Sequence, residues 1–515
     1  MWVIGLEDFS FDAGDGDGVG DILDAFPSNS AASVDTDLDG KPDQWNQDCD
    51  AICQSNSGLV LDEDDDNDGV DDTSDNCPLI ANTNQLDWDD DGNGDKCDDP
   101  VPLPDDLAGL LGKDKASTSV AFAGDFNADG YGDYVIGIPG FDVSTKTKDA
   151  GRAEVISGKN GTVLASLNGL AAKDALGTAV ASGADIDNDG FDDVVIGAPR
   201  AGATHAGSVT VLYGPNGARS EVISSTVANS GFGTAVALGN VNGDSYADIL
   251  VGAPKDDNLA LNLKDAGSVT VYSGNGLGVL GTPFYGAAAK ANAGTSVAAG
   301  DVNNNGVADI VIGAPNEGGL GSVKAYTLAG TNLLQKTGET AKAQFGKAVA
   351  VGDVNGDGYA DVLVGAPLDD NTDAALKDTG SITVFSGSNG EKLTKKYGAV
   401  AKANLGNSVA AGDVDGDSKA DIIAGAWKDD KASSNPKKPI KDAGSVSVFN
   451  GNGYAPITTL YGNAAKDFYG FAVSAGDINS DGKADLIIGI PGFDAPAVKP
   501  IKDAGKVTVV SGAAL

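Results

Sequence analysis

The stretch DFNADGYGDYVIGIPG, residues 125–140, decides the fold because its pattern occurs seven times along the chain. Asp or Asn stands at the first, third, fifth and ninth positions of every copy, and Gly or Ser stands at the sixth. A short apolar run follows, and in most copies it ends in Gly-Ala-Pro or a close variant. The copies begin at Asp125, Asp185, Asn240, Asp301, Asp353, Asp413 and Asp477.

Apolar segments of strand length surround each copy. In the third repeat, AVALG (235–239) precedes the loop, ILVGAP (249–254) follows it, and SVTVYSG (268–274) comes later. A weaker fourth segment follows, as in PITTLYG (456–462). Four short strands in each unit of about 50 to 60 residues, repeated seven times, are typical of a β-propeller. The sequence therefore predicts an all-β, seven-bladed propeller of four-stranded blades.

The polar loop of each repeat has the residue types of a calcium site. Alternate side chains at positions 1, 3 and 5 converge only where the backbone curls, and a small residue at position 6 permits that turn. Calcium takes six to eight oxygen ligands. An EF-hand begins in the same way, but its twelfth position is Glu, whereas here that position falls on Ile136 in an apolar strand. The alternative is an Asp/Asn-rich turn without metal, in which the carboxylates would repel one another.

We therefore predict that strand–loop–strand sites in the seven repeats bind Ca²⁺, about seven ions in all. The predicted ligands are Asp125, Asn127, Asp129, Asp133; Asp185, Asp187, Asp189, Asp193; Asn240, Asn242, Asp244, Asp248; Asp301, Asn303, Asn305, Asp309; Asp353, Asn355, Asp357, Asp361; Asp413, Asp415, Asp417, Asp421; and Asp477, Asn479, Asp481, Asp485. The second and sixth loops have four carboxylates each, whereas the third and fourth have two. Because more ligand charge generally tightens calcium binding, we expect loops two and six to bind most tightly and loops three and four most weakly.

The acidic residues are concentrated at the N-terminal end of the chain. The net charge is −41, and residues 1–100 contain 29 Asp or Glu against two Lys. We therefore expect an acidic module at 1–100 and the propeller at 101–515. Such a chain would repel nucleic acid, and multivalent cations are its expected partners. The alternative is solubilising acidity scattered over the surface, which the regular spacing does not favour.

All four cysteines, Cys49, Cys53, Cys77 and Cys97, lie in the acidic module. An even number in a core-poor segment favours disulfides and an oxidising compartment. Three connectivities are open, and the alternative is a zinc site, although no His is near and the spacing is not paired CxxC. No run of 18 apolar residues exists, so we expect no membrane span. The chain opens without a basic and apolar leader, and we expect an extracellular or cell-surface protein whose signal peptide lies outside this chain.

Two segments, FGTAVALGNVNGDSYADILVGAP (232–254) and FGKAVAVGDVNGDGYADVLVGAP (345–367), resemble the FG-GAP repeat of integrin alpha subunits and their bacterial relatives. The resemblance covers roughly residues 101–515. It implies calcium loops that join the first and second strands of the blades, with partners docking on the opposite face. The pattern departs from the family at Ala116-Ser117 in the first repeat, at Ala293-Gly294 in the fourth, and at Trp427 in the sixth.

The face opposite the loops carries the connections between second and third strands. Several are long and rich in lysine, such as KDDNLALNLKDAG (255–267). Long loops on a rigid scaffold commonly carry function, and the alternative is that they are solvated linkers. The seventh unit ends at VTVVSGAAL (507–515), before a fourth strand, and an open propeller would leave an unpaired edge. We expect residues 101–111 to supply that strand.

The acidic module resembles the thrombospondin type 3 repeat through DEDDDNDGVDDTSDNCP (62–78) and DWDDDGNGDKCDDP (87–100). The resemblance implies several more Ca²⁺ ions and a Cys77–Cys97 disulfide, which leaves Cys49–Cys53. It also implies a stalk with little core that calcium holds together. The implied ligands are Asp64, Asp66, Asp68, Asp72, Asp75; Asp87, Asp89, Asp91, Asp95, Asp98; Asp35, Asp37, Asp39, Asp43; and, in a weaker loop, Asp15, Asp17, Asp21, Asp24.

These features favour a calcium-dependent adhesion module that binds a protein or glycan on a cell or matrix surface. The alternatives are a carbohydrate-binding lectin and a self-associating matrix protein. We expect no enzymatic activity, since the single histidine, His205, lies in a turn-like ATHAGSV segment and no catalytic motif is present.

Overall fold

The computed structural model describes residues 19, 24–47, 49–83, 85, 107–108, 116–433, 437–495 and 501–515. The chain divides into two compact units, Met1–Val101 and Pro102–Leu515. Within the described residues, no helix is both long and apolar enough to cross a bilayer.

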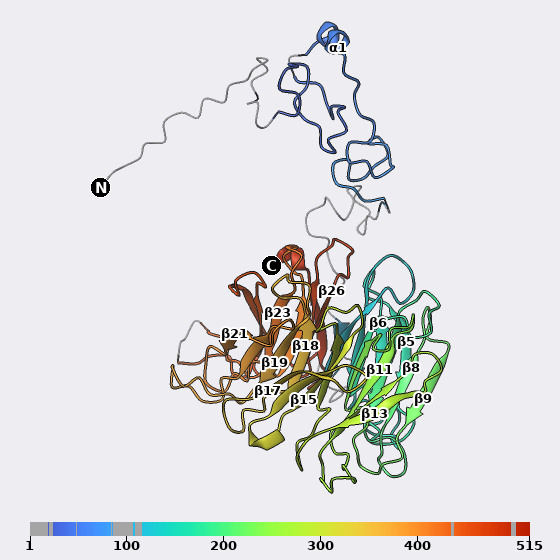
Figure 1. The fold of residues 1–515 in the computed structure, drawn as a ribbon, viewed down its shortest axis with the longest axis vertical. Helices are drawn as coiled ribbons and strands as arrows, with labels where there is room; N and C mark the ends of the chain where they lie inside the picture. The colour runs from blue at the N-terminus through green and yellow to red at the C-terminus, as the bar shows by residue number, and fades with distance from the viewer. Residues whose placement is uncertain are drawn as a thin grey trace, which may run out of the picture. The chain divides into compact units, whose positions relative to one another are not determined.

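The second unit consists of seven antiparallel sheets of four strands each, which confirms the predicted seven-bladed propeller. The first strand of each sheet contacts that of the next, and β26 contacts β2, so the ring is closed. In Figure 1 the colour passes from cyan at β6 through green and yellow to red at β26 as the blades follow one another. The first strands are β2 (Ser119–Gly124), β6 (Ala179–Ala184), β10 (Ala235–Gly239), β14 (Ser296–Gly300), β18 (Ala348–Gly352), β22 (Ser408–Gly412) and β26 (Ala472–Gly476).

The other strands follow in chain order within each blade, and two 3₁₀ turns, η1 (Glu317–Gly319) and η2 (Gly512–Ala514), lie beside them. The second strands are β3 (Asp133–Ile138), β7 (Asp193–Ala198), β11 (Asp248–Ala253), β15 (Asp309–Ala314), β19 (Asp361–Ala366), β23 (Asp421–Ala426) and β27 (Asp485–Ile490). The third strands are β4 (Arg152–Ile156), β8 (Ser208–Leu212), β12 (Ser268–Tyr272), β16 (Ser322–Tyr326), β20 (Ser381–Phe385), β24 (Ser445–Phe449) and β28 (Lys506–Val510). The outer strands are β5 (Val163–Asn168), β9 (Ser220–Ser224), β13 (Val279–Tyr285), β17 (Asn332–Thr337), β21 (Lys392–Tyr397), β25 (Pro456–Tyr461) and β1 (Leu107–Ala108).

The last blade takes its outer strand from the beginning of the propeller. Leu107 pairs with Val507 and Ala108 with Lys506 in antiparallel register. This two-residue strand lies within residues 101–111, the segment that we expected to supply the closing strand. The rest of that segment lies outside the described residues. Pairing the two ends of the propeller removes an exposed sheet edge.

The core lies between neighbouring blades. The second strand of each blade is buried along its whole length. This burial explains why these strands are continuous runs of Val, Ile and Leu. Seven apolar clusters fill the spaces between successive sheets, and one of them joins the last blade to the first through Ile487, Val507 and Ile136. Burial of these β-branched side chains closes the ring.

Two glycines of the repeat meet at six of the seven blade interfaces. A Cβ at Gly365 of β19 would lie 2.0 Å from the carbonyl oxygen of Gly406, which opens the next blade. The Gly406 amide in turn donates to the carbonyl of Gly425 in its own blade at 3.0 Å. In the first repeat Ser117 occupies the corresponding left-handed position, with φ 62°, so the departure from Phe-Gly keeps the backbone conformation.

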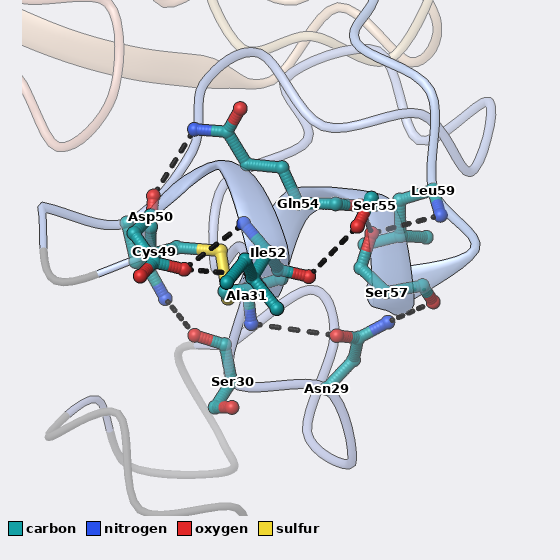
Figure 2. The surroundings of a disulfide bond; sticks show 12 residues. Asn29, Ser30, Ala31, Cys49, Asp50, Ile52, Gln54, Ser55, Ser57 and Leu59 are labelled. Carbon is teal, nitrogen blue, oxygen red and sulfur yellow. Dashed lines mark hydrogen bonds between the residues drawn. A yellow bond between two sulfur atoms is a disulfide. The ribbon is translucent and has the colours of Figure 1, made fainter.

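The acidic unit contains one helix that the sequence analysis did not predict, α1 (Ala51–Ser57). The Asp50 carboxylate accepts from the amides of Ile52 and Cys53 and caps its N-terminus. Figure 2 shows this cap beside the Cys49–Cys53 disulfide, the pairing that the resemblance left for these two cysteines. The implied Cys77–Cys97 bond involves Cys97, which lies outside the described residues.

Candidate metal centres

The predicted loops of the propeller curl around their own acidic side chains. In the first loop, the Asp125 carboxylate accepts from the amides of Asp129 at 3.0 Å and Gly130 at 2.9 Å. The Asn127 side-chain oxygen accepts from the Asp129 amide at 3.1 Å, and the Asp129 carboxylate accepts from the Tyr131 amide at 3.1 Å. These bonds connect the side chains at positions 1, 3 and 5 to the backbone of their own loop, so the loop is curled.

The Asp at position 9 has a second role, which the sequence analysis missed. Asp193 is the first residue of β7 and is fully buried. One of its oxygens accepts from the Ile186 amide at 2.8 Å, and the other accepts from the Gly214 amide at 2.9 Å, just after the third strand. This carboxylate therefore joins the loop to the end of β8. The sequence contains one signal for this contact, which is the Ser-Gly that ends the third apolar segment of several repeats.

Burial raises the pKa of these position-9 carboxyls. The pKa rises to about 7 for Asp133, Asp193 and Asp485, and to about 6 for Asp309, Asp361 and Asp421. Desolvation is the largest cause in each, and neighbouring loop carboxylates raise the pKa further. A cation in the loop would act in the opposite sense, because it favours the charged form.

Among the described residues, four groups of three carboxylates come close enough to share one ion. In each group, one oxygen per residue lies within 4.8 Å of the others. The two groups in the propeller belong to loops two and six, which have the most carboxylates. The groups are Asp185, Asp187 and Asp193; Asp413, Asp415 and Asp421; Asp35, Asp37 and Asp39; and Asp64, Asp66 and Asp68.

Several buried oxygens in these loops have no hydrogen-bond partner among the described residues. They are Oδ1 of Asp35, Oδ2 of Asp66, Oδ2 of Asp75 and Oδ1 of Asp187. A buried carboxylate oxygen without a donor is costly, and a bound cation would satisfy it. The donor set therefore fits a hard cation that prefers oxygen, such as Ca²⁺.

The described loops of the acidic unit use the same hydrogen bonds as the propeller loops. The Gly40 amide donates to Asp35 and the Gly69 amide donates to Asp64, each at 3.0 Å. The position-9 residue Asp72 accepts from the amide of Asp65 at 2.9 Å. The loop from Asp87 to Asp98, and Asp15, Asp17 and Asp21 of the weaker loop, lie outside the described residues. Asp24, the last member of the weaker loop, accepts from the Phe26 amide at 2.8 Å.

The two loops with the fewest carboxylates are arranged differently. In the fourth loop, the Asn303 side-chain amide donates to both oxygens of Asp309, at 3.0 and 2.8 Å. In the third, the Asn240 side-chain amide donates to the Asp244 carbonyl. Amide donors thus satisfy acceptors that a cation would otherwise contact. In loop two, Asp187 forms an ion pair with Arg219. The two residues are 32 positions apart in the chain, so the local spacing of the loop did not predict this contact.

On the opposite face, the long connections between second and third strands share a pattern of hydrogen bonds and ion pairs. The Asp370 carboxylate accepts from the Asp378 amide at 2.9 Å and forms an ion pair with Lys377. Its neighbour Asp369 is buried and accepts from the Ser381 hydroxyl at 2.7 Å. Equivalent Asp–Lys pairs recur at Asp142–Lys148, Asp430–Lys441 and Asp494–Lys502. His205 is an exposed turn residue whose Nδ1 lies 3.0 Å from the Arg200 carbonyl oxygen.

Comparison with known proteins agrees with this architecture. The model of the FG-GAP repeat family matches residues 176–212, 232–272, 293–326, 345–385, 405–449 and 469–510. The family model thus matches six segments of the chain. Each matched segment contains one of the second to seventh predicted metal loops, from its first to its fourth predicted ligand.

The chain is also similar in sequence to integrin alpha subunits. Integrin alpha-V of Gallus gallus is 33% identical over 219 residues, 39% of this chain and 20% of the relative. Integrin alpha-5 of Xenopus laevis is 30% identical over 267 residues, 47% of this chain and 24% of the relative. The match therefore spans about a fifth to a quarter of each relative's length. Among solved structures, a chain of the BBS1N–ARL6DN complex soaked with lead superposes with a TM-score of 0.44 at 10% identity, over 79% of this chain and 97% of that chain.

Proposed function

We propose that this protein is a calcium-dependent binding module that acts outside the cell or at its surface and recognises a protein or glycan. The observation that carries the proposal is the set of curled acidic loops, each at the start of a buried second strand of an integrin-alpha-like propeller. The Cys49–Cys53 disulfide supports an oxidising compartment. The similarity to integrin alpha subunits supports a binding rather than a catalytic role.

Calcium is the proposed ligand of the seven propeller loops. The support is the grouping of the position-1, position-3 and position-9 carboxylates in loops two and six, together with the unpartnered Oδ1 of Asp187. In this proposal the cation neutralises the carboxylates of each loop and stabilises its connection to the buried second strand. Loops two and six bind most tightly.

Residues 1–100 are proposed to form a thrombospondin type 3-like stalk, and residues 101–515 the binding propeller. The described part of the stalk buries few apolar residues, namely Ala31, Ala32, Cys49 and Cys77. So small a core cannot offset the conformational entropy of the segment. Calcium binding to the loops at Asp35 and Asp64 would supply the missing free energy.

The ligand is proposed to bind the face opposite the metal loops. At the axis of that face, a cavity of about 340 Å³ is lined by residues that precede the first strand of every blade. Four of these are threonines, and the remaining three blades contribute Lys347, Asn407 and Phe471. Valines two residues further along the first strands, including Val236 and Val349, line the same cavity.

The test is binding of the purified chain to matrix proteins, intact cells and glycans, in millimolar calcium and again in EGTA. Binding that EGTA abolishes would support the proposal. Binding that is unchanged in EGTA, or no binding to any surface while the fold is intact in calcium, would contradict it. Static light scattering in the same buffers tests the alternative of a self-associating matrix protein, which predicts a calcium-dependent increase in mass.

A further inference from the structure

Two adjoining cavities on the face opposite the metal loops are rich in cations. The first, about 460 Å³, lies between the second and third blades and is lined by Lys173, Arg200 and Lys255. The second, about 560 Å³, is lined by Lys255, Lys290 and Lys342. Lys255 belongs to both, so the two cavities form one continuous surface, which we call the basic arc and define by these five cations.

The basic arc contrasts with the charge of the whole chain. The net charge is −41, yet only one acidic residue, Asp265, lines the two cavities. None of the five cations forms an ion pair among the described residues, whereas lysines of the neighbouring connections, such as Lys377 and Lys441, do. The arc therefore presents uncompensated positive charge, which electrostatically attracts an anionic ligand.

The backbone holds the lysines of the arc in place. Lys173, Lys290 and Lys342 have left-handed φ values of 70°, 60° and 66°. Their amides donate to carbonyls of the preceding blade at 2.8, 2.8 and 2.9 Å. Gly or Asn adopts this conformation at lower cost than Lys, and Asn229 does so at the corresponding place in the third blade. The scaffold thus fixes the spacing of the backbone positions that carry these lysines.

The other lining groups favour a saccharide over a peptide. Asn229, Asn292 and Asn316 line the cavities. Asn292 donates to the Pro254 carbonyl and accepts from Asn316, each at 2.8 Å, and the remaining donors and acceptors of these carboxamides suit hydroxyl groups. Peptide recognition commonly uses an exposed sheet edge, an apolar groove or an aromatic-lined groove, and no Phe, Tyr or Trp is among the described residues that line the two cavities. Clustered arginines recognise acidic peptide motifs through bidentate contacts, and the arc has a single Arg.

We propose that the basic arc binds an acidic polysaccharide, with adjacent anionic sugar units in the two cavities. The inference rests on the proposed binding function and specifies its ligand class. Each cavity is within the size range of small-molecule sites. Contact through several lysines predicts that binding weakens with rising salt.

The experiment titrates the full chain in 1 mM calcium with a sulfated heparin hexasaccharide. A neutral dextran oligomer and a poly-glutamate peptide of matched charge serve as comparison probes. The arc variant combines Lys255→Gln, Lys290→Gln and Lys342→Gln. The control variant combines Lys402→Gln and Lys466→Gln, which share the left-handed backbone position but do not line the cavities. Thermal unfolding of both variants checks that the propeller is folded.

We expect the hexasaccharide to bind the parent chain and the control variant equally, and the arc variant about tenfold or more weakly, because three cation–anion contacts are lost. No hexasaccharide binding, or an equal loss in both variants, would overturn the inference. Tighter binding of poly-glutamate would also overturn it and identify an acidic-peptide surface. Failure of the proposed function would be observed in a different experiment, as surface binding that does not depend on calcium. That outcome would not change the result of the hexasaccharide titration.

Discussion

The Ser117 hydroxyl accepts a hydrogen bond from the Ile490 amide at 3.0 Å, although 373 residues separate the two in the chain. Ser117 is fully buried, and its side-chain oxygen also contacts the carbonyl of Lys506. This contact joins the first blade to the last at the point where each of the other blades has a glycine, preceded by Leu, Phe, Ala or Tyr. The first repeat therefore departs from the family pattern where the ring has to close.

Replacement of Ser117 should weaken this closure. Ser117→Ala leaves the buried Ile490 amide without its acceptor and keeps a side chain at φ 62°, so we expect a loss of about 2 kcal/mol in unfolding free energy. Ser117→Gly also loses the hydroxyl but relieves the left-handed strain, so it should cost about 1 kcal/mol less than Ala. Denaturant unfolding in calcium measures both. Equal stability of parent and both variants would show that the contact contributes nothing to closure.

Substitution at the glycine pair between blades should be more severe. A Cβ at Gly365 would overlap the Gly406 carbonyl oxygen at 2.0 Å, and backbone cannot move aside cheaply, so Gly365→Ala should cost about 3 kcal/mol. Gly278 has no atom within 4 Å of its ideal Cβ position, so Gly278→Ala is the matched control and should change stability by less than about 0.5 kcal/mol. A similar effect of both substitutions would refute the steric account.

Calcium removal should affect the two units unequally. The described acidic unit buries only four apolar residues, whereas seven apolar clusters stabilise the propeller. We expect EGTA to raise hydrogen exchange across residues 24–83 to nearly unfolded rates, while the second strands of the propeller remain protected. Retention of slow exchange in the acidic unit without calcium would show that it folds without the ion.

The calcium affinity of a propeller loop should rise with the number of carboxylates that the loop contains. Neutralising one ligand of a rich loop, as in Asp187→Asn or Asp415→Asn, should lower the affinity of that loop by about tenfold, since one cation–carboxylate contact is lost. The complementary change Asn303→Asp should raise the affinity of the fourth loop. Site-resolved calcium titration by NMR or terbium luminescence can measure each. An unchanged fourth loop after Asn303→Asp would contradict the charge argument.

The basic arc and the metal loops lie at opposite ends of the same buried strands. Arg200 and Lys255 follow β7 and β11, whereas Asp193 and Asp248 begin those strands. A six-residue strand spans about 20 Å, so the acidic and basic surfaces are separated by the full height of a blade. The anionic ligand proposed for the arc would therefore not be repelled at short range by the acidic loops.

Local spacing in the sequence predicted the repeats, the strands and the curled loops. The bonds that shape each loop, such as those from Asp129 and Gly130 to Asp125, join residues within a few positions of one another. The continuous burial of the second strands also agrees with their apolar composition. Helix α1 was not predicted, because seven residues without buried side chains leave no apolar periodicity to detect.

The tertiary structure alone decided the features that depend on distant residues. The sequence placed Asp193 among the metal ligands, but only the folded blade brings the Gly214 amide to its second oxygen. Likewise, only ring closure brings Ser117 to Ile490, and only the stacking of successive blades places Lys173, Lys255 and Lys342 on one surface. The sequence by itself thus determined the repeating unit, because its turns and strands rely on contacts between near neighbours. The ring closure, the contact of each buried position-9 Asp with the end of the third strand, and the basic arc depend on the packing of strands and blades around one axis.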